Sequence, residues 1–225
     1  MGEPSPDRQG FLASLDEQER RALIDRASTR RFRRGTYLFS EGDLSDHVVV
    51  IVQGRVKICS YTADGGEVVY AMRGPGELLG ELSTLDGRPR SATVAALDPV
   101  EALLVPAPEF QAYLEEHPRV AVMLLRTVVG RLREANLRRV EFGTHDVTGR
   151  VAQRLLELAE QFGERINAEI HVELPLTQEE LAGWTGASRE AVSKALRSLR
   201  DRGTIRTHRR EIVIRDLEAL QRRAT

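Results

Sequence analysis

Two stretches of this sequence hold residue types that bind phosphates or nucleic acids, at spacings that suit that chemistry. The first, residues 76–94, contains Glu81, Arg90 and Ser91 among several glycines. Glycines let the backbone approach a ligand, and backbone N–H groups bind anions. A carboxylate accepts hydrogen bonds from sugar hydroxyls, while an arginine and a serine donate to phosphate oxygens. The spacing predicts a ribose phosphate site, with an ordinary surface pair of Glu81 and Arg90 as the alternative.

The second stretch, residues 176–196, has the pattern of a helix-turn-helix. Thr177 is placed to cap a first helix, with Glu180 three residues on. Gly186 stands where a tight turn between helices needs a positive φ, and Ser188 is placed to cap the second helix. In a helix-turn-helix the second helix lies in the major groove of DNA, so the pattern predicts DNA binding.

The second helix divides into a buried stripe and an outward face. Apolar side chains recur on one side, at Val192, Ala195, Leu196 and Leu199. The outward side chains near its start are Arg189, Glu190, Ser193 and Lys194. Arginine pairs with guanine, and glutamate accepts a hydrogen bond from cytosine N4, so this face is suited to reading base edges. The alternative is a plain helical hairpin with a salt-bridged surface.

A predicted β-hairpin follows, from residues 204–206 and 212–214, around the sequence His208-Arg209-Arg210-Glu211. Such a wing is suited to contacting phosphates. The whole chain has a net charge of −1, but from Ser188 to the end it has 11 basic and 5 acidic residues. A basic end favours a polyanionic partner. The predicted DNA-binding residues are Thr177, Gln178, Ser188, Arg189, Glu190, Ser193, Lys194, His208 and Arg209.

Composition excludes several classes. The 225 residues are 41% hydrophobic and 30% charged, as in a soluble globular protein. One cysteine, Cys59, rules out an internal disulfide, a four-cysteine iron–sulfur cluster and a zinc finger, and a reducing cytoplasm fits. The histidines do not cluster, so we expect no metal, no haem and no enzyme activity. No apolar run is long enough for a membrane span, and Met1–Gly10, which we expect to be disordered, does not read as a signal peptide.

Short β-rich runs separated by turn residues predict a small antiparallel roll. The runs are residues 37–39, 47–52, 55–61, 67–72, 92–96 and 101–105. Before them, Ser14 and Glu17 predict a capping box and a helix to about Ala27. After them, a short helix is expected from Pro108 to Glu116.

A long helix is predicted from Arg119 to about Thr144. Apolar residues recur along it every three or four positions and form a stripe that needs a partner. We favour a second copy of the chain; the alternative is a helix lying across its own domain. Gly143–Asp146 is expected to form a hinge, with Asp146 capping a helix over 147–162. The region 163–175 is expected to be loop with a strand over 170–174.

On these motifs the sequence resembles the CRP/FNR superfamily of transcription regulators, most closely its cyclic AMP receptor protein branch. The matching parts are Gly80-Glu81-Leu82 with Arg90-Ser91-Ala92, Asp146 to Arg150, and the helix-turn-helix. The resemblance implies an α+β fold with three parts: a cyclic-nucleotide-binding antiparallel β-roll (11–117), a dimerisation helix with hinge (118–145) and a winged helix-turn-helix (146–225).

The resemblance also implies a ligand site. The glutamate matching Glu81 binds the ribose 2′-hydroxyl, and the residues matching Arg90 and Ser91 bind the cyclic phosphate. The branch usually has threonine followed by serine or asparagine at the adenine contacts, whereas here Ala135 and Asn136 stand there. Asn136 is expected to reach a base or, alternatively, to fix the register of the seam. The cyclic-nucleotide residues are expected to be Gly80, Glu81, Leu82, Arg90, Ser91, Arg131 and Asn136.

The implied function is a cytoplasmic, homodimeric regulator that binds inverted-repeat double-stranded DNA under control of cyclic AMP, with RNA polymerase as a further partner. Lys194 replaces the common arginine of the recognition helix, which loses a bidentate fork. Three alternatives remain open: control by another ligand or ligand-independent DNA binding, a nucleotide-binding regulatory subunit of an enzyme, and a gas or redox sensor. A regulatory subunit would not need the winged helix.

Overall fold

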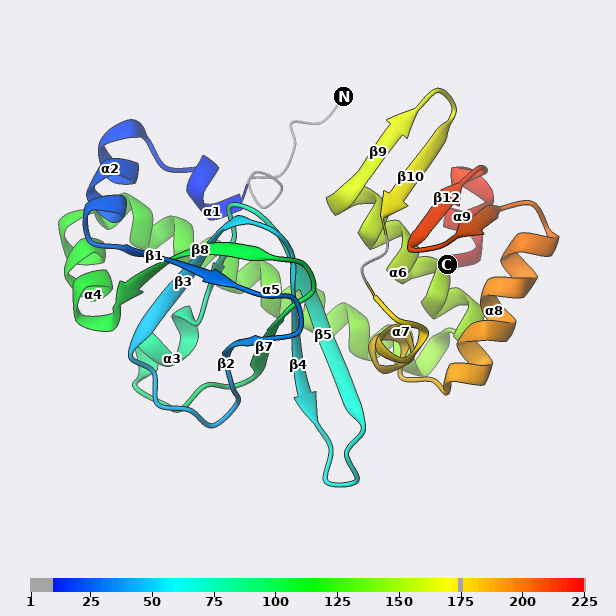
Figure 1. The fold of residues 1–225 in the computed structure, drawn as a ribbon, viewed down its shortest axis with the longest axis horizontal. Coiled ribbons are helices and arrows are strands. Elements are labelled where there is room, and N and C mark those ends of the chain that lie inside the picture. Colours follow the sequence, from blue (N-terminus) through cyan, green and yellow to red (C-terminus); the bar gives the residue numbers. More distant parts are fainter. Residues whose placement is uncertain (1–9, 174–175, 225) are drawn as a thin grey trace. The chain divides into compact units, whose positions relative to one another are not determined.

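The computed structural model describes residues 10–173 and 176–224, which form two compact units (Figure 1). The first unit contains the described residues up to Ser60 together with Tyr70–Glu134. The second contains Tyr61–Val69 and the described residues from Ala135 onward. The expected disorder of Met1–Gly10 lies, apart from Gly10, outside the described residues.

Eight strands make two antiparallel four-stranded sheets, which form the predicted roll. One sheet has the order β1-β8-β3-β6, and the other has the order β2-β7-β4-β5. Their bounds are β1 Ser28–Phe32, β2 Tyr37–Phe39, β3 His47–Gln53, β4 Val56–Tyr61, β5 Glu67–Arg73, β6 Leu78–Leu79, β7 Thr93–Ala96 and β8 Val100–Pro106. The strands coincide with the predicted runs to within about one residue at each end, and β1 and β6 are additional.

The alternation of side chains along β3 builds the core of the first unit on two sides. Val49 and Ile51 pack inside the roll, while Val48 and Val50 pack on the other face, toward the helices. Because successive strand residues point to opposite faces, an unbroken apolar run is buried on both. The helices beginning in this unit are α1 Gly10–Ala13, α2 Glu17–Asp25, α3 Glu81–Asp86, α4 Ala107–Glu116 and α5 Pro118–Thr144.

The cap of α2 differs from the prediction. Asp16, and not Ser14, is the N-cap: its carboxylate accepts from the Glu19 backbone N–H at 2.8 Å, and the Glu19 carboxylate accepts from the Asp16 N–H at 2.9 Å. Ser14 instead donates its hydroxyl to the carbonyl of Gly10. Two overlapping capping-box patterns lie in this sequence, and the predicted one, Ser14 with Glu17, was wrong.

Helix α5 leaves an apolar face uncovered within the chain. Val120 and Leu124 near its start are buried, but Leu125 and Leu132 are 62% and 60% exposed. The exposed apolar residues of α5 are Val122, Leu125, Val129, Leu132, Leu137, Val140 and Phe142. No helix of the described part of the chain has the length and apolar character to cross a membrane.

The second unit contains four helices after α5 and one further sheet among its described residues. Its elements are α6 Val147–Phe162, β9 Gly163–Ile166, β10 Glu169–Glu173, α7 Gln178–Thr185, α8 Arg189–Asp201, β11 Ile205–His208, β12 Glu211–Ile214 and α9 Leu217–Ala224. The sheet order is β11-β12-β10-β9, antiparallel throughout. Strand β10 matches the predicted strand, whose last residue, 174, lies outside the described residues. Strand β9 and helix α9 were not predicted.

Residues 145 and 146 separate α5 from α6 at the predicted hinge. As predicted, Asp146 caps α6, accepting from the Gly149 N–H at 2.8 Å. Its carboxylate also pairs with Arg223 of α9. Buried Arg154 of α6 pairs with Glu141 of α5 and, at 2.9 Å, with Glu157. Within this unit, ion pairs therefore hold the end of α5 to α6 across the connection.

Candidate functional site

The first candidate site is built on the turn from β6 into α3. Gly80 is the N-cap of α3 and has φ 79°, a left-handed conformation that favours glycine. A Cβ at this position would overlap the guanidinium of Arg90. Glu81, the first residue of α3, is only 3% exposed. Glycine at position 80 therefore lets the Arg90 guanidinium approach the backbone directly before a buried carboxylate.

Arg90 is also 3% exposed, and its guanidinium is held inside the roll. It donates to the carbonyls of Gly80 at 2.9 Å and His47 at 2.5 Å, and to the Ser83 hydroxyl at 3.1 Å. It also lies over the Phe39 ring, 4.2 Å from its centroid. Burial lowers the pKa of this guanidinium, and nearby carboxylates oppose that shift. Arg90 Nε is buried without a hydrogen-bond partner.

The carboxylate of Asp46 lies 3.9 Å from Arg90 and contacts the ring of His47. Burial acts to raise the pKa of Asp46, but the His47 hydrogen bond and the positive charges nearby outweigh it, so the pKa is lowered. Asp46 therefore supplies negative charge beside Arg90. The sequence analysis did not identify His47, Ser83 or Phe39 as partners of Arg90, because no local pattern links them to it.

Glu81 is bound from α5. Arg131 Nη1 donates to Glu81 Oε1 at 2.7 Å, and Arg131 Nη2 donates to the Leu78 carbonyl at 2.9 Å and to Glu77 at 3.1 Å. Burial acts to lower the pKa of Arg131, but the two carboxylates outweigh it, so the pKa is raised. The other oxygen of Glu81, Oε2, accepts no hydrogen bond from the described residues. One acceptor thus remains for a ligand hydroxyl.

The structure brings together four of the seven predicted ligand residues: Gly80, Glu81, Arg90 and Arg131. Leu82 and Ser91 are neighbours of these residues in the chain and are exposed. An unpartnered Arg90 Nε and an open carboxylate oxygen on Glu81 suit a small anion that also carries a hydroxyl. Asn136 belongs to the second unit, so its part in this site stays a prediction.

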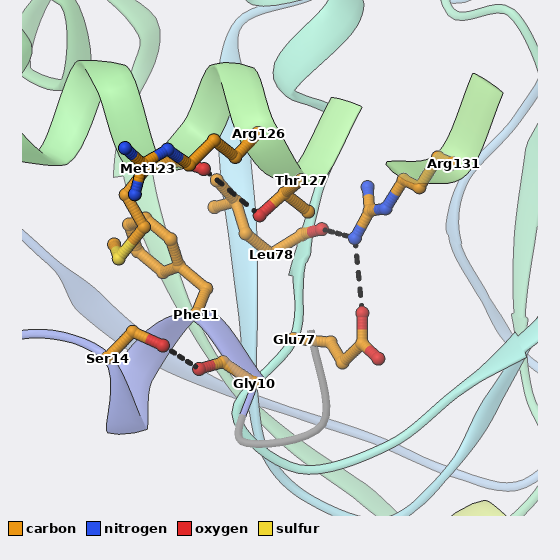
Figure 2. Close-up of a pocket in the computed structure, with 9 residues that line it drawn as sticks. All are labelled: Gly10, Phe11, Ser14, Glu77, Leu78, Met123, Arg126, Thr127 and Arg131. Carbon is orange, nitrogen blue, oxygen red and sulfur yellow. Dashed lines mark hydrogen bonds and ion pairs between the residues drawn. The ribbon is translucent and has the colours of Figure 1, made fainter. Parts of the chain in front are cut away.

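A cavity lies beside the Glu77–Arg131 ion pair (Figure 2). Of the predicted ligand residues, only Arg131 lines it. The other lining residues are Gly10, Phe11, Ser14, Glu77, Leu78, Met123, Arg126 and Thr127. Among the described residues, no three His, Cys, Asp or Glu side chains gather in a way that could hold a metal ion.

The second candidate site is the helix-turn-helix of α7 and α8. Thr177 and Glu180 form the predicted capping box of α7, with the Glu180 N–H donating to the Thr177 hydroxyl at 3.1 Å. Gly186 ends α7 with φ 57°. Ser188 caps α8 by accepting from the Ala191 N–H at 3.2 Å. These predictions are confirmed. The caps were predictable from the sequence because each one joins residues three apart in the chain.

Helix α8 separates its residues as predicted. The buried side consists of Val192, Ala195, Leu196 and Leu199. Arg189, Glu190 and Lys194 are exposed, and Ser193 is half-buried. Hydrogen bonds from its own N–H and from Ser188 lower the pKa of Glu190, which therefore carries negative charge at neutral pH. The outward face offers cations and an acceptor near the helix start, as base reading requires.

Strands β11 and β12 form the predicted wing, with Arg209 and Arg210 at the turn. Arg210 has φ 61°. His208 and Arg209 are exposed, while β12 is anchored by three buried residues, 212–214. Arg200 of α8 donates to the Thr207 hydroxyl at 3.1 Å and connects the wing to the helix. The anchored hairpin thus presents exposed basic side chains.

Comparison with known families matches both halves of the chain. Residues 29–117 match the cyclic nucleotide-binding domain, and residues 149–223 match the Crp-like helix-turn-helix domain. A cyclic nucleotide-binding roll with a DNA-binding helix-turn-helix defines a class of transcription regulator. The chain belongs to the CRP/FNR superfamily of these regulators.

Relatives of known function are similar over most of their length. The chain is 36% identical to the "CRP-like cAMP-activated global transcriptional regulator" of Mycobacterium tuberculosis, over 96% of this chain and 97% of that protein. It is 32% identical to the "Cyclic AMP receptor protein" of Thermus thermophilus, over 85% and 86%. FixK2 from Bradyrhizobium japonicum shares the fold, with a TM-score of 0.80 at 23% identity, over 88% and 98% of the two chains.

Proposed function

We propose that this transcription regulator is a homodimer whose affinity for an inverted-repeat operator is controlled by cyclic AMP. The observation that carries the proposal is the contact of Arg90 with the backbone of Gly80, the residue directly before Glu81. Arg90 donates to the carbonyl of the residue directly before Glu81, so a phosphate-binding guanidinium and a hydroxyl-binding carboxylate are adjacent. A cyclic nucleotide carries both groups, and the relatives from Mycobacterium tuberculosis and Thermus thermophilus are named for cyclic AMP.

Each ligand residue then has a role. Glu81 accepts a hydrogen bond from the ribose 2′-hydroxyl, Arg90 and Ser91 donate to the cyclic phosphate, and Arg131 holds Glu81 in place. Gly80 and Leu82 contribute backbone next to the ligand. Asn136 contacts the base. Ala135 lacks the hydroxyl that the branch usually places beside it, which weakens recognition of adenine.

Calorimetry on the whole protein tests the ligand. We expect heat of binding for cyclic AMP, and weaker binding of linear AMP, whose phosphate carries a different charge and shape. Cyclic GMP distinguishes base recognition from recognition of the ribose and phosphate. Absence of binding for both cyclic nucleotides would contradict the proposed effector.

The dimer is proposed from the exposed apolar face of α5. Leu125 and Leu132 lie on one stripe and are about three-fifths exposed, and apolar stripes of this kind pair in coiled coils. Light scattering at micromolar concentration, with and without DNA, should give twice the mass of one chain. A monomeric mass in both conditions would contradict the dimer.

DNA recognition is assigned to two groups of residues. Arg189, Glu190, Ser193 and Lys194 read bases, while Thr177, Gln178, Ser188, His208 and Arg209 contact the sugar–phosphate backbone. In a dimer the two recognition helices bind half-sites about one turn of DNA, ~34 Å, apart. We place this activity in the cytoplasm, with RNA polymerase as a partner and no catalysis. Selection of binding sequences from a random pool should return an inverted repeat.

The proposal divides the chain into a ligand-binding domain (11–117), a dimerisation helix with hinge (118–145) and a DNA-binding domain (146–225). Ligand-independent DNA binding is a second candidate, because Ala135 removes one expected ligand contact on α5. DNA titrations with and without nucleotide separate the two functions: an unchanged affinity supports ligand independence.

A further inference from the structure

Five charged side chains of the first unit form a chain of alternating sign that starts at Glu81. Arg131 joins Glu81, at 2.7 Å, to Glu77, at 3.1 Å. Arg73 joins Glu77, at 3.3 Å, to Glu134, at 3.5 Å. Figure 2 shows the contact between Arg131 and Glu77. This series of ion pairs thus links the proposed ribose-binding carboxylate, Glu81, to α5 at two points, Arg131 and Glu134.

The two points lie on one face of α5. Arg131 and Glu134 are three residues apart, and residues at this spacing are neighbours on a helix surface. Arg73 is the last residue of β5, and Glu77 lies in the segment after it. Both residues therefore contact this face of α5 from the side of the roll. Arg73 is almost fully buried and also donates to the Met72 carbonyl at 2.9 Å. We call Glu77 and Arg73 the ionic clamp.

Arg131 needs the clamp because it is partly buried, with 21% of its side chain exposed. A guanidinium largely withdrawn from water needs compensating charge and hydrogen bonds. Glu81 alone would have to supply that charge and accept a ligand hydroxyl as well. Glu77 provides a second carboxylate, so Arg131 stays in position while Glu81 Oε2 remains open. Without Glu77, only the Leu78 carbonyl and Glu81 itself would hold Arg131, and the orientation of Glu81 would be less fixed.

We propose that Glu77 and Arg73 are positioning residues for ligand binding, which act through Arg131 to aim Glu81 at a ribose 2′-hydroxyl. This inference rests on the proposed function. It also gives α5 a link to the ligand that does not depend on the missing hydroxyl at Ala135. The ribose, rather than the base, is then the part of the nucleotide that this link senses.

The test measures affinities of the full-length protein for cyclic AMP and 2′-deoxy cyclic AMP by calorimetry. The second ligand has no hydroxyl for Glu81, so misplacing Glu81 should not affect it. We expect Glu77→Gln to weaken cyclic AMP binding about tenfold, the scale of one charge-assisted hydrogen bond. Its effect on the 2′-deoxy ligand should be less than about twofold. Arg73→Gln should show the same selectivity with a smaller loss.

The matched control is Glu101→Gln, because Glu101 pairs with Arg31 at 2.7 Å in the same unit but away from the clamp. It should change neither affinity. If the Glu77 and Arg73 variants do not fold, Glu134→Gln replaces them, because Glu134 is the exposed end of this series of charges. It should show the same selectivity for cyclic AMP over the 2′-deoxy ligand. Equal losses of affinity for the two ligands, or no loss for either, would overturn the proposed role of the ionic clamp. A wild-type protein that binds neither ligand would instead contradict the proposed function.

Discussion

The charged residues of the two proposed sites are in opposite environments. In the first unit Glu81 and Arg90 are each 3% exposed and are bonded to other protein groups. In the second unit Arg189 and Lys194 are exposed, and they donate no hydrogen bond to the described residues. At the first site most of the charged groups already bond to the protein, although Arg90 Nε does not. At the second site Arg189 and Lys194 face solvent.

The difference indicates how each site works. A ligand that bonds to the open Glu81 Oε2 and Arg90 Nε lies among groups that already have protein partners, so binding there is expected to rearrange the surrounding contacts. Among the described residues, Arg189 and Lys194 of the recognition helix have no such hydrogen-bond partners to exchange. Its caps and buried stripe fix its backbone, so its side chains are ready for DNA. A mutation should therefore affect the two sites in different ways.

The largest effect is expected for Arg90→Ala. Truncating one partner of a buried charged contact costs about 2–5 kcal/mol, so the affinity for cyclic AMP should fall at least about 30-fold. Arg88→Ala is the control, since Arg88 is exposed and two residues away. Calorimetry gives both affinities. Similar affinities for the two variants would mean that burial of Arg90 has no bearing on the ligand.

Arg189→Ala should cost about 1–3 kcal/mol at a specific DNA site and leave nucleotide affinity unchanged. Glu190→Ala should relax the base preference. Arg209→Ala, in the wing, should weaken all sequences about equally and flatten the salt dependence. Titrations against specific and random DNA at several salt concentrations separate these roles. A change of sequence preference in the wing variant alone would reverse the assignment.

Asp146 is an intermediate case between the buried, bonded charges of the first site and the exposed charges of the second, because it is exposed and yet bonded to other protein groups. Its carboxylate accepts from the Gly149 N–H and pairs with Arg223 at 2.5 Å, and these contacts lower its pKa. Asp146→Ala should cost about 1 kcal/mol of folding free energy. Asparagine also caps helices, so Asp146→Asn should cost less, through the Arg223 pair alone. Chemical denaturation measures both variants, and equal costs would assign the whole effect to the ion pair.

The pH dependence of that cost has a defined sign. A lowered pKa in the folded state means that the contribution of Asp146 is present above its unfolded pKa of about 3.9. It is lost as the pH falls through the folded pKa. The difference between wild type and Asp146→Ala should therefore be full at neutral pH and shrink below about pH 4.

The smallest effect is expected for Ala135→Thr. A new hydroxyl at the adenine-contact position should add one hydrogen bond, about 0.5–1.5 kcal/mol, to cyclic AMP binding. The nucleotide should then enhance DNA affinity more than it does in the wild type. Ala135→Val, of similar shape without the hydroxyl, is the control. An identical response from the two variants would leave the hydroxyl without a role.

What the sequence predicted depends on the distance between partners along the chain. The caps at Thr177, Ser188 and Asp146 each join residues three positions apart, and all three are confirmed. Strand β1 was missed because four of its five residues, Ser28–Arg31, are polar and exposed, so no alternation marks it. Helix α9 was missed although Leu220 anchors it in the core.

The interior of the ligand site was less predictable. Glu81, Arg90 and Arg131 carry the right chemistry, and the structure brings them together. Their partners lie far along the chain: His47 is 43 residues from Arg90, and Glu77 is 54 residues from Arg131. Only the folded roll makes these contacts, so the ionic clamp could not be derived from local patterns.

DNA titrations at one fixed salt concentration test the central claim, that the buried site at Glu81 and Arg90 controls DNA binding by the exposed recognition helix α8. Wild type and Arg90→Ala would each be titrated with and without saturating cyclic AMP, so that only differential affinity for the two states can shift DNA binding. We predict that cyclic AMP raises the DNA affinity of the wild type and has no effect on Arg90→Ala. Equal enhancement in both proteins would contradict control through this site.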